Sequence, residues 1–455
     1  MAVKQEGKAV RAAEPVLKNL TFGVEFEAFT LDSKGYMASG SEKLIKRVKE
    51  TNQNIAIVKE CGQNMLEINS FPHTNIQNNM LKVIEDFEAV LHCAEKDGLA
   101  IYAYGTYPGS FKPEMRQDKR YAIQEQILGK TRFLHAARCV GLHCHCSLPW
   151  GVFDSKLRII KNLVNSKNKQ CMVNTYNLFI AIDPALTTFA QSSPFYQGKF
   201  LGKDSRVIVY RGGDALKYPH GLYTNYPDFG MLQPYKSTGT DLLQIISKRF
   251  DSWSSILKNL DVNLKVLLKH GSILDTTWNP IKISSHGTIE QRGMDMNHPS
   301  IVVAIATAVK YISKELQDKF VQVMPSDIGV TEPFKREGNV IHIPPHTHIR
   351  FELQPKSAYK GLEDNAVYAY CSGILKLAKS CIPKDRLVLI EPLGRMLKER
   401  KTVSDHILSQ AKKMGIDIKK VTNKQAAELA LRYSRELFKD IILTKQVLKS
   451  LSSDL

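Results

Sequence analysis

The stretch from Phe22 to Phe29 reads FGVEFEAF, and it strongly limits what the chain can fold into. Apolar residues alternate with polar ones there, and period-two alternation is typical of a β-strand whose side chains point to opposite faces. Glu25 and Glu27 therefore project from one face, about 7 Å apart. Like charges at this spacing repel each other, so we expect a cation between them unless the glutamates lie on a solvated edge strand.

Two later stretches predict strands with further polar groups on one face. The sequence KECGQNMLEINSFPH at 59–73 places Glu67 on the polar side of a strand. In GLHCHCSLP at 141–149, His143 and His145 share one face while two cysteines lie on the other, which disfavours a four-ligand zinc site. The histidines are candidates for a metal or phosphate site, with hydrogen-bonded core histidines as the alternative.

A fourth stretch, GTIEQRGMD at 287–295, predicts a strand with Glu290 and Arg292 on one face. The alternative for this pair is a strand ion pair, which is worth little at a surface. Together the four strands gather carboxylates, imidazoles and an arginine, which are costly to bury unless cations and phosphates fill the space. Such ligands suit Mg²⁺ or Mn²⁺ bridging nucleotide phosphates, which indicates phosphoryl chemistry.

Helices are predicted between these strands by apolar residues at helical spacing. The expected helices are 41–50, a helix with its N-cap at Thr74 that ends before Gly98, 155–164, 170–190, 300–320, 404–414 and 423–451. We expect a further strand at 99–104 and loops at 107–119 and 325–339, the last of them mobile.

Two other groups are candidates for binding. Arg206 and Arg211 lie in a loop-rich tract, where arginine suits bidentate contacts to carboxylate or phosphate, although surface arginines are common. A histidine-rich hairpin whose strand continues to Glu352 is a second metal candidate, with exposed histidines beside a turn as the alternative. Its histidines are His342, His346 and His348.

Composition narrows the class of protein. At ~150 residues per domain, 455 residues suggest about three domains, although one large sheet also reaches this length. There is no apolar run of about 18 residues, so we expect no membrane span. Eight scattered cysteines and no apolar leader indicate a reducing cytoplasm. The net charge of +18 allows anionic partners, but the basic residues form short clusters typical of solvated helix faces.

Five motifs make the chain similar to a known family. FGVEFEAF, ECGQNMLEINSFPH, GLHCHCSLP, SSPFYQG and GTIEQRGMD follow one another between Phe22 and Lys310, and in this the chain resembles the glutamate–cysteine ligase type 2 and carboxylate–amine ligase family. The resemblance implies an α+β, glutamine synthetase-like fold, in which a curved, mainly antiparallel sheet forms a funnel with helices outside. We expect a disordered tail at 1–20, a catalytic domain at 21–400 and C-terminal helices packed on it at 401–455.

The resemblance also implies an activity. In the family, ATP phosphorylates the γ-carboxylate of glutamate, and the amine of cysteine displaces phosphate to give γ-glutamylcysteine, with Mg²⁺ or Mn²⁺ bridging ATP. The residues that match metal ligands are Glu25, Glu27, Glu67, His143 and Glu290; those that match ATP or substrate contacts are Glu60, Gln63, His145 and Arg206; and those that match catalytic residues are Arg292 and Arg211. His145 stands where some members have another polar residue, so its role is open.

Two alternatives remain at this point. The same type of ligase acts on other amines or acids in the family, and no residue here fixes the small-molecule substrates. More distantly, the positive charge allows a non-catalytic nucleic-acid-binding protein. The chain has no GxxxxGK[ST] sequence, so a P-loop enzyme is not expected.

Overall fold

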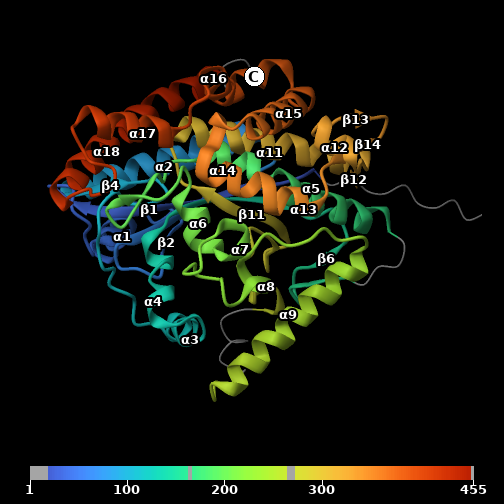
Figure 1. The fold of residues 1–455 in the computed structure, drawn as a ribbon, viewed down its shortest axis with the longest axis horizontal. Coiled ribbons are helices and arrows are strands. Elements are labelled where there is room, and N and C mark those ends of the chain that lie inside the picture. Colours follow the sequence, from blue (N-terminus) through green and yellow to red (C-terminus); the bar gives the residue numbers. More distant parts are fainter. Residues whose placement is uncertain (1–18, 162–165, 264–271, 452–455) are drawn as a thin grey trace, which may run out of the picture.

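The structure is a computed structural model that describes residues 19–161, 166–263 and 272–451. The predicted disordered tail falls almost wholly on residues 1–18, which lie outside the described residues. The centre of the fold is a seven-stranded sheet (Figure 1) in which every strand pair is antiparallel. Its order is β10 (Ile281–Ile283), β11 (Thr288–Asp295), β5 (Gly141–Ser147), β1 (Phe22–Asp32), β3 (Met65–Asn69) and β2 (Ile57–Lys59), and β4 (Leu99–Tyr102) pairs with the far end of β1. The predicted α+β class with an antiparallel sheet is confirmed.

The register of the sheet brings the polar residues of separate strands together. Glu25 of β1 lies opposite His143 of β5, and Glu27 lies opposite Glu67 of β3. Further along the sheet, Glu290 of β11 pairs with His145 of β5. Directly opposed residues in an antiparallel pair point to the same face, so these side chains form one continuous polar surface.

One face of the sheet is covered by long helices (Figure 1). Cys144 and Cys146 point to this face and are fully buried, and the Cys146 thiol lies 3.3 Å from the Ser313 hydroxyl of α11. The polar residues of β5 therefore face the opposite side. The covering helices are α2 (Ile76–Lys96), α5 (Lys167–Ala190), α11 (Pro299–Lys319), α15 (Asn365–Cys381), α16 (Glu391–Glu399), α17 (Val403–Lys413) and α18 (Asn423–Ser450). Of these, α18 packs against α2 and β4.

The polar face of the sheet carries a second set of elements (Figure 1), and some of them line a cavity. They are α3 (Lys119–Leu128), α4 (Lys130–Phe133), α6 (Ser205–Arg211), α7 (Gly213–Leu216), α8 (Pro227–Gly230) and α9 (Gly239–Asn259), with the hairpin of β6 (Phe153–Asp154) and β7 (Ile159–Ile160). Smaller elements complete the fold: α1 (Ser41–Thr51), β8 (Phe195–Tyr196), β9 (Lys199–Phe200) and α14 (Gln354–Lys360). Among the described residues, no helix combines the length and apolar character needed to cross a membrane.

Several predicted helices are confirmed with small shifts. Helix α2 begins one residue later than expected, because the Asn75 side chain and not Thr74 accepts hydrogen bonds from the first-turn amides. Pro299 opens α11, where a missing amide hydrogen costs nothing. Pro184 lies inside α5, and the helix continues through it to Ala190.

Three predictions of local structure are wrong. The helix at 155–164 is replaced, in its described part, by the β6–β7 hairpin, because the Asp154 carboxylate accepts hydrogen bonds from the Lys156 and Leu157 amides and stabilises a turn. The loop at 325–339 contains α12 (Asp327–Thr331) and β13 (Arg336–Glu337), beside β12 (Gln322–Pro325) and β14 (Val340–Ile343). The strand predicted to reach Glu352 ends at Ile343, and α13 (His346–His348) and a π-helix (Ile349–Leu353) follow.

Candidate active site

A cavity of about 550 Å³ lies on the polar face of the sheet. Strands β1, β3, β5 and β11 form its floor, and α3, α6, α9 and the loops beside them form its walls. The ionisable floor residues are Glu25, Glu27, Glu60, Glu67, His143, His145, Lys282 of the neighbouring strand β10, Glu290 and Arg292. Strands far apart in sequence therefore place their polar groups in a single enclosed space.

Potential metal ligands gather in three overlapping groups on this floor. Within each group, one ligand atom per residue lies within 4.8 Å of the others. The groups are Glu25, Glu67 and His143; Glu25, His145 and Glu290; and Glu27, Glu60 and Glu67. Oxygen-rich sets with one imidazole suit a hard divalent cation.

The imidazole of His143 is positioned as a ligand. Its Nδ1 lies 2.6 Å from Glu25 Oε2, which fixes the ring orientation. Its Nε2 is buried and makes no hydrogen bond to any described residue, although Glu27 Oε1 lies 3.5 Å away. A buried ring nitrogen without a hydrogen bond is uncommon, and a bound cation would satisfy it. The residues present therefore fit a divalent ion.

We define the acid end of the floor as Glu25, Glu27, Glu60, Glu67 and His143. Burial raises the pKa of Glu25, but its contacts with His143 and His145 outweigh burial and hold the pKa well below its ordinary value. Glu60 and Glu67 have no such cationic partner within ion-pair distance among the described residues. Burial and the neighbouring carboxylate of Glu27 raise the pKa of Glu60 to about 7. Burial and the charges of Glu25, Glu60 and Glu27 raise the pKa of Glu67 well above its ordinary value. These carboxylates are costly to ionise together, and a divalent cation would remove that cost.

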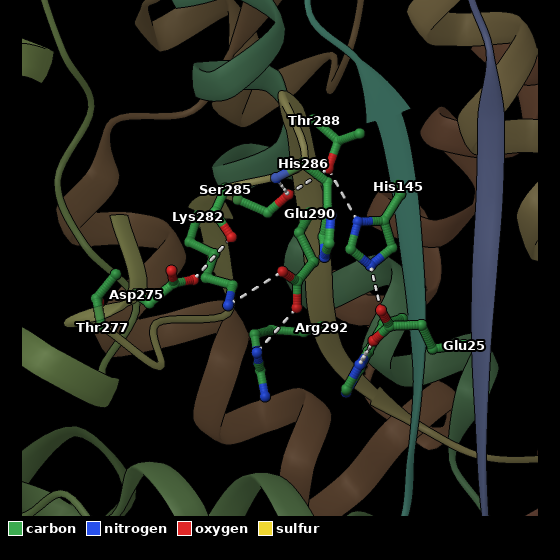
Figure 2. A network of polar contacts seen from close by, with 12 residues as sticks. Glu25, His145, Asp275, Thr277, Lys282, Ser285, His286, Thr288, Glu290 and Arg292 are labelled. Atoms are coloured by element: carbon green, nitrogen blue, oxygen red, sulfur yellow. Dashed lines mark hydrogen bonds and ion pairs between the residues drawn. The ribbon is translucent and has the colours of Figure 1, made fainter. Parts of the chain in front are cut away.

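The cation end of the floor, which we define as Lys282, Glu290 and Arg292, is balanced by the protein itself. Figure 2 shows the Glu290 carboxylate between the two cations, 3.2 Å from Lys282 Nζ and 2.9 Å from an Arg292 guanidinium nitrogen. Burial raises the pKa of Glu290, but the charges of Lys282, Arg292 and His145 outweigh it and hold the pKa at about 2. Glu290 is thus ionised at any physiological pH.

His145 connects the two ends of the floor. Its Nδ1 lies 2.9 Å from the Thr288 hydroxyl, and its Nε2 lies 3.1 Å from Glu25 Oε1 (Figure 2). Burial lowers the pKa of His145, but the hydrogen bond with Glu25 and the charge of Glu290 raise it above the ordinary value overall. This imidazole, beside the floor carboxylates, is well placed to contact a phosphate or to act as a metal ligand.

Sequence reasoning missed several residues of the site. Lys282 lies on the three-residue strand β10, directly opposite Glu290 of β11. Only the register of this strand pair, and no sequence motif, would have indicated that Lys282 belongs to the site. The walls also include basic and aromatic side chains that lie outside the strands with alternating polar and apolar residues. They are Arg120, Tyr121, Phe133, Arg158, Tyr210, Tyr223, Trp253 and Trp278.

Three predicted site residues lie outside the cavity lining. Arg211 is buried in an ion pair with Asp183 of α5 at 2.6 Å and also donates to Gln354, so its charge is already used in packing. Arg206 is buried behind the floor, where it donates to the Arg292 carbonyl oxygen at 3.1 Å. The Gln63 backbone joins neighbouring loops, and its side chain does not line the cavity.

The histidine-rich segment does not gather metal ligands. His342 lies 2.9 Å from the Ser326 hydroxyl, and His346 is bonded to the Leu232 carbonyl. In the part of the chain that the structure describes, the groups of three potential ligands include none of these histidines. We therefore do not retain this segment as a metal site.

The fold is shared with solved structures of low sequence identity. A bifunctional glutathione synthetase from Pasteurella multocida superposes with a TM-score of 0.58 at 13% identity, covering 92% of this chain and 53% of that one. A glutamate–cysteine ligase from Francisella tularensis, solved in complex with AMP, gives a TM-score of 0.55 at 12% identity over 97% of this chain and 94% of that one. Together with the antiparallel sheet and its outer helices, these likenesses confirm the predicted fold class.

The chain belongs to glutamate–cysteine ligase family 2, since residues 21–324 match the family over about two thirds of the sequence. Among relatives, a protein of Corynebacterium jeikeium provisionally named glutamate–cysteine ligase 2 is 22% identical over 60% of this chain and 58% of its own length. A protein of the same provisional name from Chloroflexus aurantiacus is 23% identical over 42% of this chain and 44% of its own length. The chain thus matches about half the length of these relatives.

Proposed function

We propose that the protein is an ATP-dependent carboxylate–amine ligase that joins the γ-carboxylate of glutamate to the amine of cysteine, giving γ-glutamylcysteine, ADP and phosphate. The observation that carries this proposal is the adjacency of two unlike environments on one cavity floor. Three groups of potential cation ligands lie beside Lys282 and Arg292. Phosphoryl transfer from a metal–nucleotide complex to a carboxylate requires this combination.

The acid end would hold the metal ions. Glu25, Glu67 and His143 form one ligand set, and Glu27 and Glu60 extend it. Bound Mg²⁺ or Mn²⁺ would neutralise the triphosphate and polarise the transferred phosphoryl group. Without such cations, the carboxylates of this end would repel a nucleotide.

The cation end would stabilise the charge that develops on the transferred group. Arg292 offers a fixed fork of N–H donors and Lys282 a compact charge, and the Glu290 carboxylate holds both in place at about 3 Å. Both cations are fixed before the substrate arrives, so little reorganisation is needed as the acyl phosphate forms.

The walls would exclude water from the reactive acyl phosphate. Tyr223 and Trp278 stack with ring centroids 6.1 Å apart, and Trp253 packs against Trp278 at 5.0 Å. Bulky aromatic walls reduce the access of water to the reacting groups, which slows hydrolysis of the intermediate. The amine then displaces phosphate, and the carbon–nitrogen bond forms as the carbon–oxygen bond to phosphate breaks.

The proposal is tested by ADP formation with ATP, Mg²⁺, glutamate and cysteine, and mass spectrometry of the product. We expect ADP formation that requires both substrates and yields one γ-glutamylcysteine per ADP. Turnover with glutamate and a different amine would retain the ligase class and reject cysteine as the acceptor. ATP turnover with no combination of acids and amines would contradict the ligase proposal itself.

A further inference from the structure

A second cavity of about 180 Å³ lies next to the aromatic wall of the active-site cavity. The chain from Pro227 to Lys236 forms one side of it, and α9 and Asn279 form the other. None of the floor residues of the active-site cavity lines it. It is therefore a separate space with its own chemistry.

Two buried cations of this second cavity lack an acidic partner. Lys236 is 6% exposed and Arg249 is 8% exposed. Among residues 19–161, 166–263 and 272–451, no carboxylate lies within ion-pair distance of either. Lys236 Nζ donates to the Pro234 carbonyl at 2.8 Å, and the Arg249 guanidinium makes no hydrogen bond to a described residue. Both side chains are largely buried and line the same cavity, so two like charges face a space in which an anion would be a favourable partner.

The rim of the second cavity adds positive charge. Lys248 is exposed there. Among the described residues, the half-buried Arg350 guanidinium donates a hydrogen bond only to the Met231 sulfur at 3.0 Å, which is a weak acceptor. Asp228 is the acidic residue of the lining, and it is exposed. The lining thus has four cations and one solvated carboxylate. Asp241 and Asp214, outside the lining, also interact with Lys236 and Arg350 and leave a smaller positive balance.

The burial of Lys236 has a measurable consequence for its own ionisation. Burial, and next the charge of Arg249, lower the pKa of Lys236 to about 8. The two cations thus repel each other across the cavity, and an anion between them would relieve that repulsion.

We propose that this second cavity binds a small oxyanion of the phosphate type. Its volume of about 180 Å³ is below the roughly 300 Å³ of sites for larger ligands, which favours a small anion. The guanidinium fork of Arg249 and the ammonium of Lys236 provide charged donors that phosphate accepts. The inference concerns binding alone and does not depend on the ligase activity.

Anion binding here would be transmitted to the active-site wall. The Phe229 carbonyl, on the second cavity's side, accepts a hydrogen bond from the Trp278 amide at 2.7 Å. Asn279 donates to the Met231 carbonyl at 2.6 Å, which ties the same two segments together. Trp278 lines the active-site cavity, so an anion that orders the segment from Pro227 to Lys236 also steadies this wall.

The test is a phosphate titration of the full chain in EDTA, with chloride adjusted to hold ionic strength constant and with melting temperature and heat of binding as readouts. We expect saturable binding and a rise in melting temperature. Arg249→Gln and Lys236→Met should each weaken phosphate binding roughly tenfold or more, the loss expected for a charged hydrogen bond. If either of these variants does not fold, Arg350→Gln at the rim should still weaken binding several-fold.

Two controls locate the anion. Lys258→Gln removes an exposed charge from the same helix outside the cavity, and Arg292→Gln removes a cation of the active-site floor; both should retain wild-type phosphate affinity. The proposal is overturned if Arg292→Gln abolishes phosphate binding while Arg249→Gln does not. It is also overturned if phosphate raises the melting temperature of all variants equally, because a salt that is merely excluded from the protein surface stabilises every variant alike. Tight binding of malonate without binding of phosphate would also overturn it.

Discussion

The acid end and the cation end of the cavity floor share one sheet but treat a buried carboxylate in opposite ways. At the cation end, Lys282 and Arg292 hold the pKa of Glu290 at about 2. At the acid end, burial and neighbouring carboxylates raise the pKa of Glu60 to about 7 and raise that of Glu67 well above its ordinary value. The difference shows which half of the floor is complete as folded and which half requires a cation from solution.

The largest effect is expected from a change at the acid end. Glu25→Gln keeps the size of the side chain but removes the charge shared by two of the ligand groups, so we expect the rate of ADP formation to fall by roughly 10³-fold. The rise in melting temperature on adding Mg²⁺ should disappear as well.

The control for this change is Glu428→Gln, which removes an exposed carboxylate on α18. It should leave both the rate and the effect of Mg²⁺ unchanged. If Glu25→Gln retained the wild-type response to Mg²⁺, the acid end would not be the cation site and the comparison between the two ends would fail.

A smaller effect is expected at the cation end. Arg292→Lys preserves the charge that balances Glu290 but loses the planar fork of donors, so we expect the rate to fall by roughly 10²-fold while Mg²⁺ still raises the melting temperature. Arg395→Lys, at an exposed position of α16, is the matched control and should have no effect. Loss of the Mg²⁺ response in Arg292→Lys would show that the two ends are not separable.

The sequence predicted the part of the floor that depends on alternation within strands. Glu25, Glu67, His143 and Glu290 were placed on common faces because period two needs no knowledge of the tertiary structure. Glu60 was included only through the family motif, because it lies just outside a strand. Lys282 was missed because its strand has three residues and its role follows from pairing with β11.

Two predictions depended on a distant partner that the sequence does not reveal. Arg211 was assigned a catalytic role, yet Asp183, on the buried helix α5, neutralises it from across the core. The histidine-rich segment was expected to be a hairpin, but it leaves the sheet after Ile343 and becomes helical. In both cases the residue type was informative, but its partner could not be read from neighbouring residues.

A raised carboxyl pKa does not by itself show that a residue belongs to a cation site. Asp295 provides a test, because its pKa is raised although it lies outside the active-site cavity. Burial raises the pKa of Asp295 to about 6, against hydrogen bonds from Ser193 and Ser192 and the charge of Arg206. Asp295 lies at the end of β11 and does not line the active-site cavity. Its high pKa therefore reflects burial in the core and not a place for a cation.

The smallest effect on activity is thus expected for Asp295→Asn, which keeps an oxygen to accept the Ser192 amide. In the unfolded chain an aspartate has its ordinary pKa near 3.9, so the folded protein binds this proton more tightly. The bound proton of Asp295 therefore stabilises the folded protein, and this stabilisation is complete below about pH 4. It is lost as the pH rises through about 6, which lowers the free energy of unfolding by about 3 kcal/mol for a pKa difference of about two units. Relative to the variant, the wild-type protein should lose that stability between these pH values in urea unfolding, while the two ADP-formation rates stay within about twofold. Equal pH dependence of unfolding in both proteins would show that the Asp295 proton is not held by burial, whereas a large loss of activity would extend the functional floor beyond the cavity.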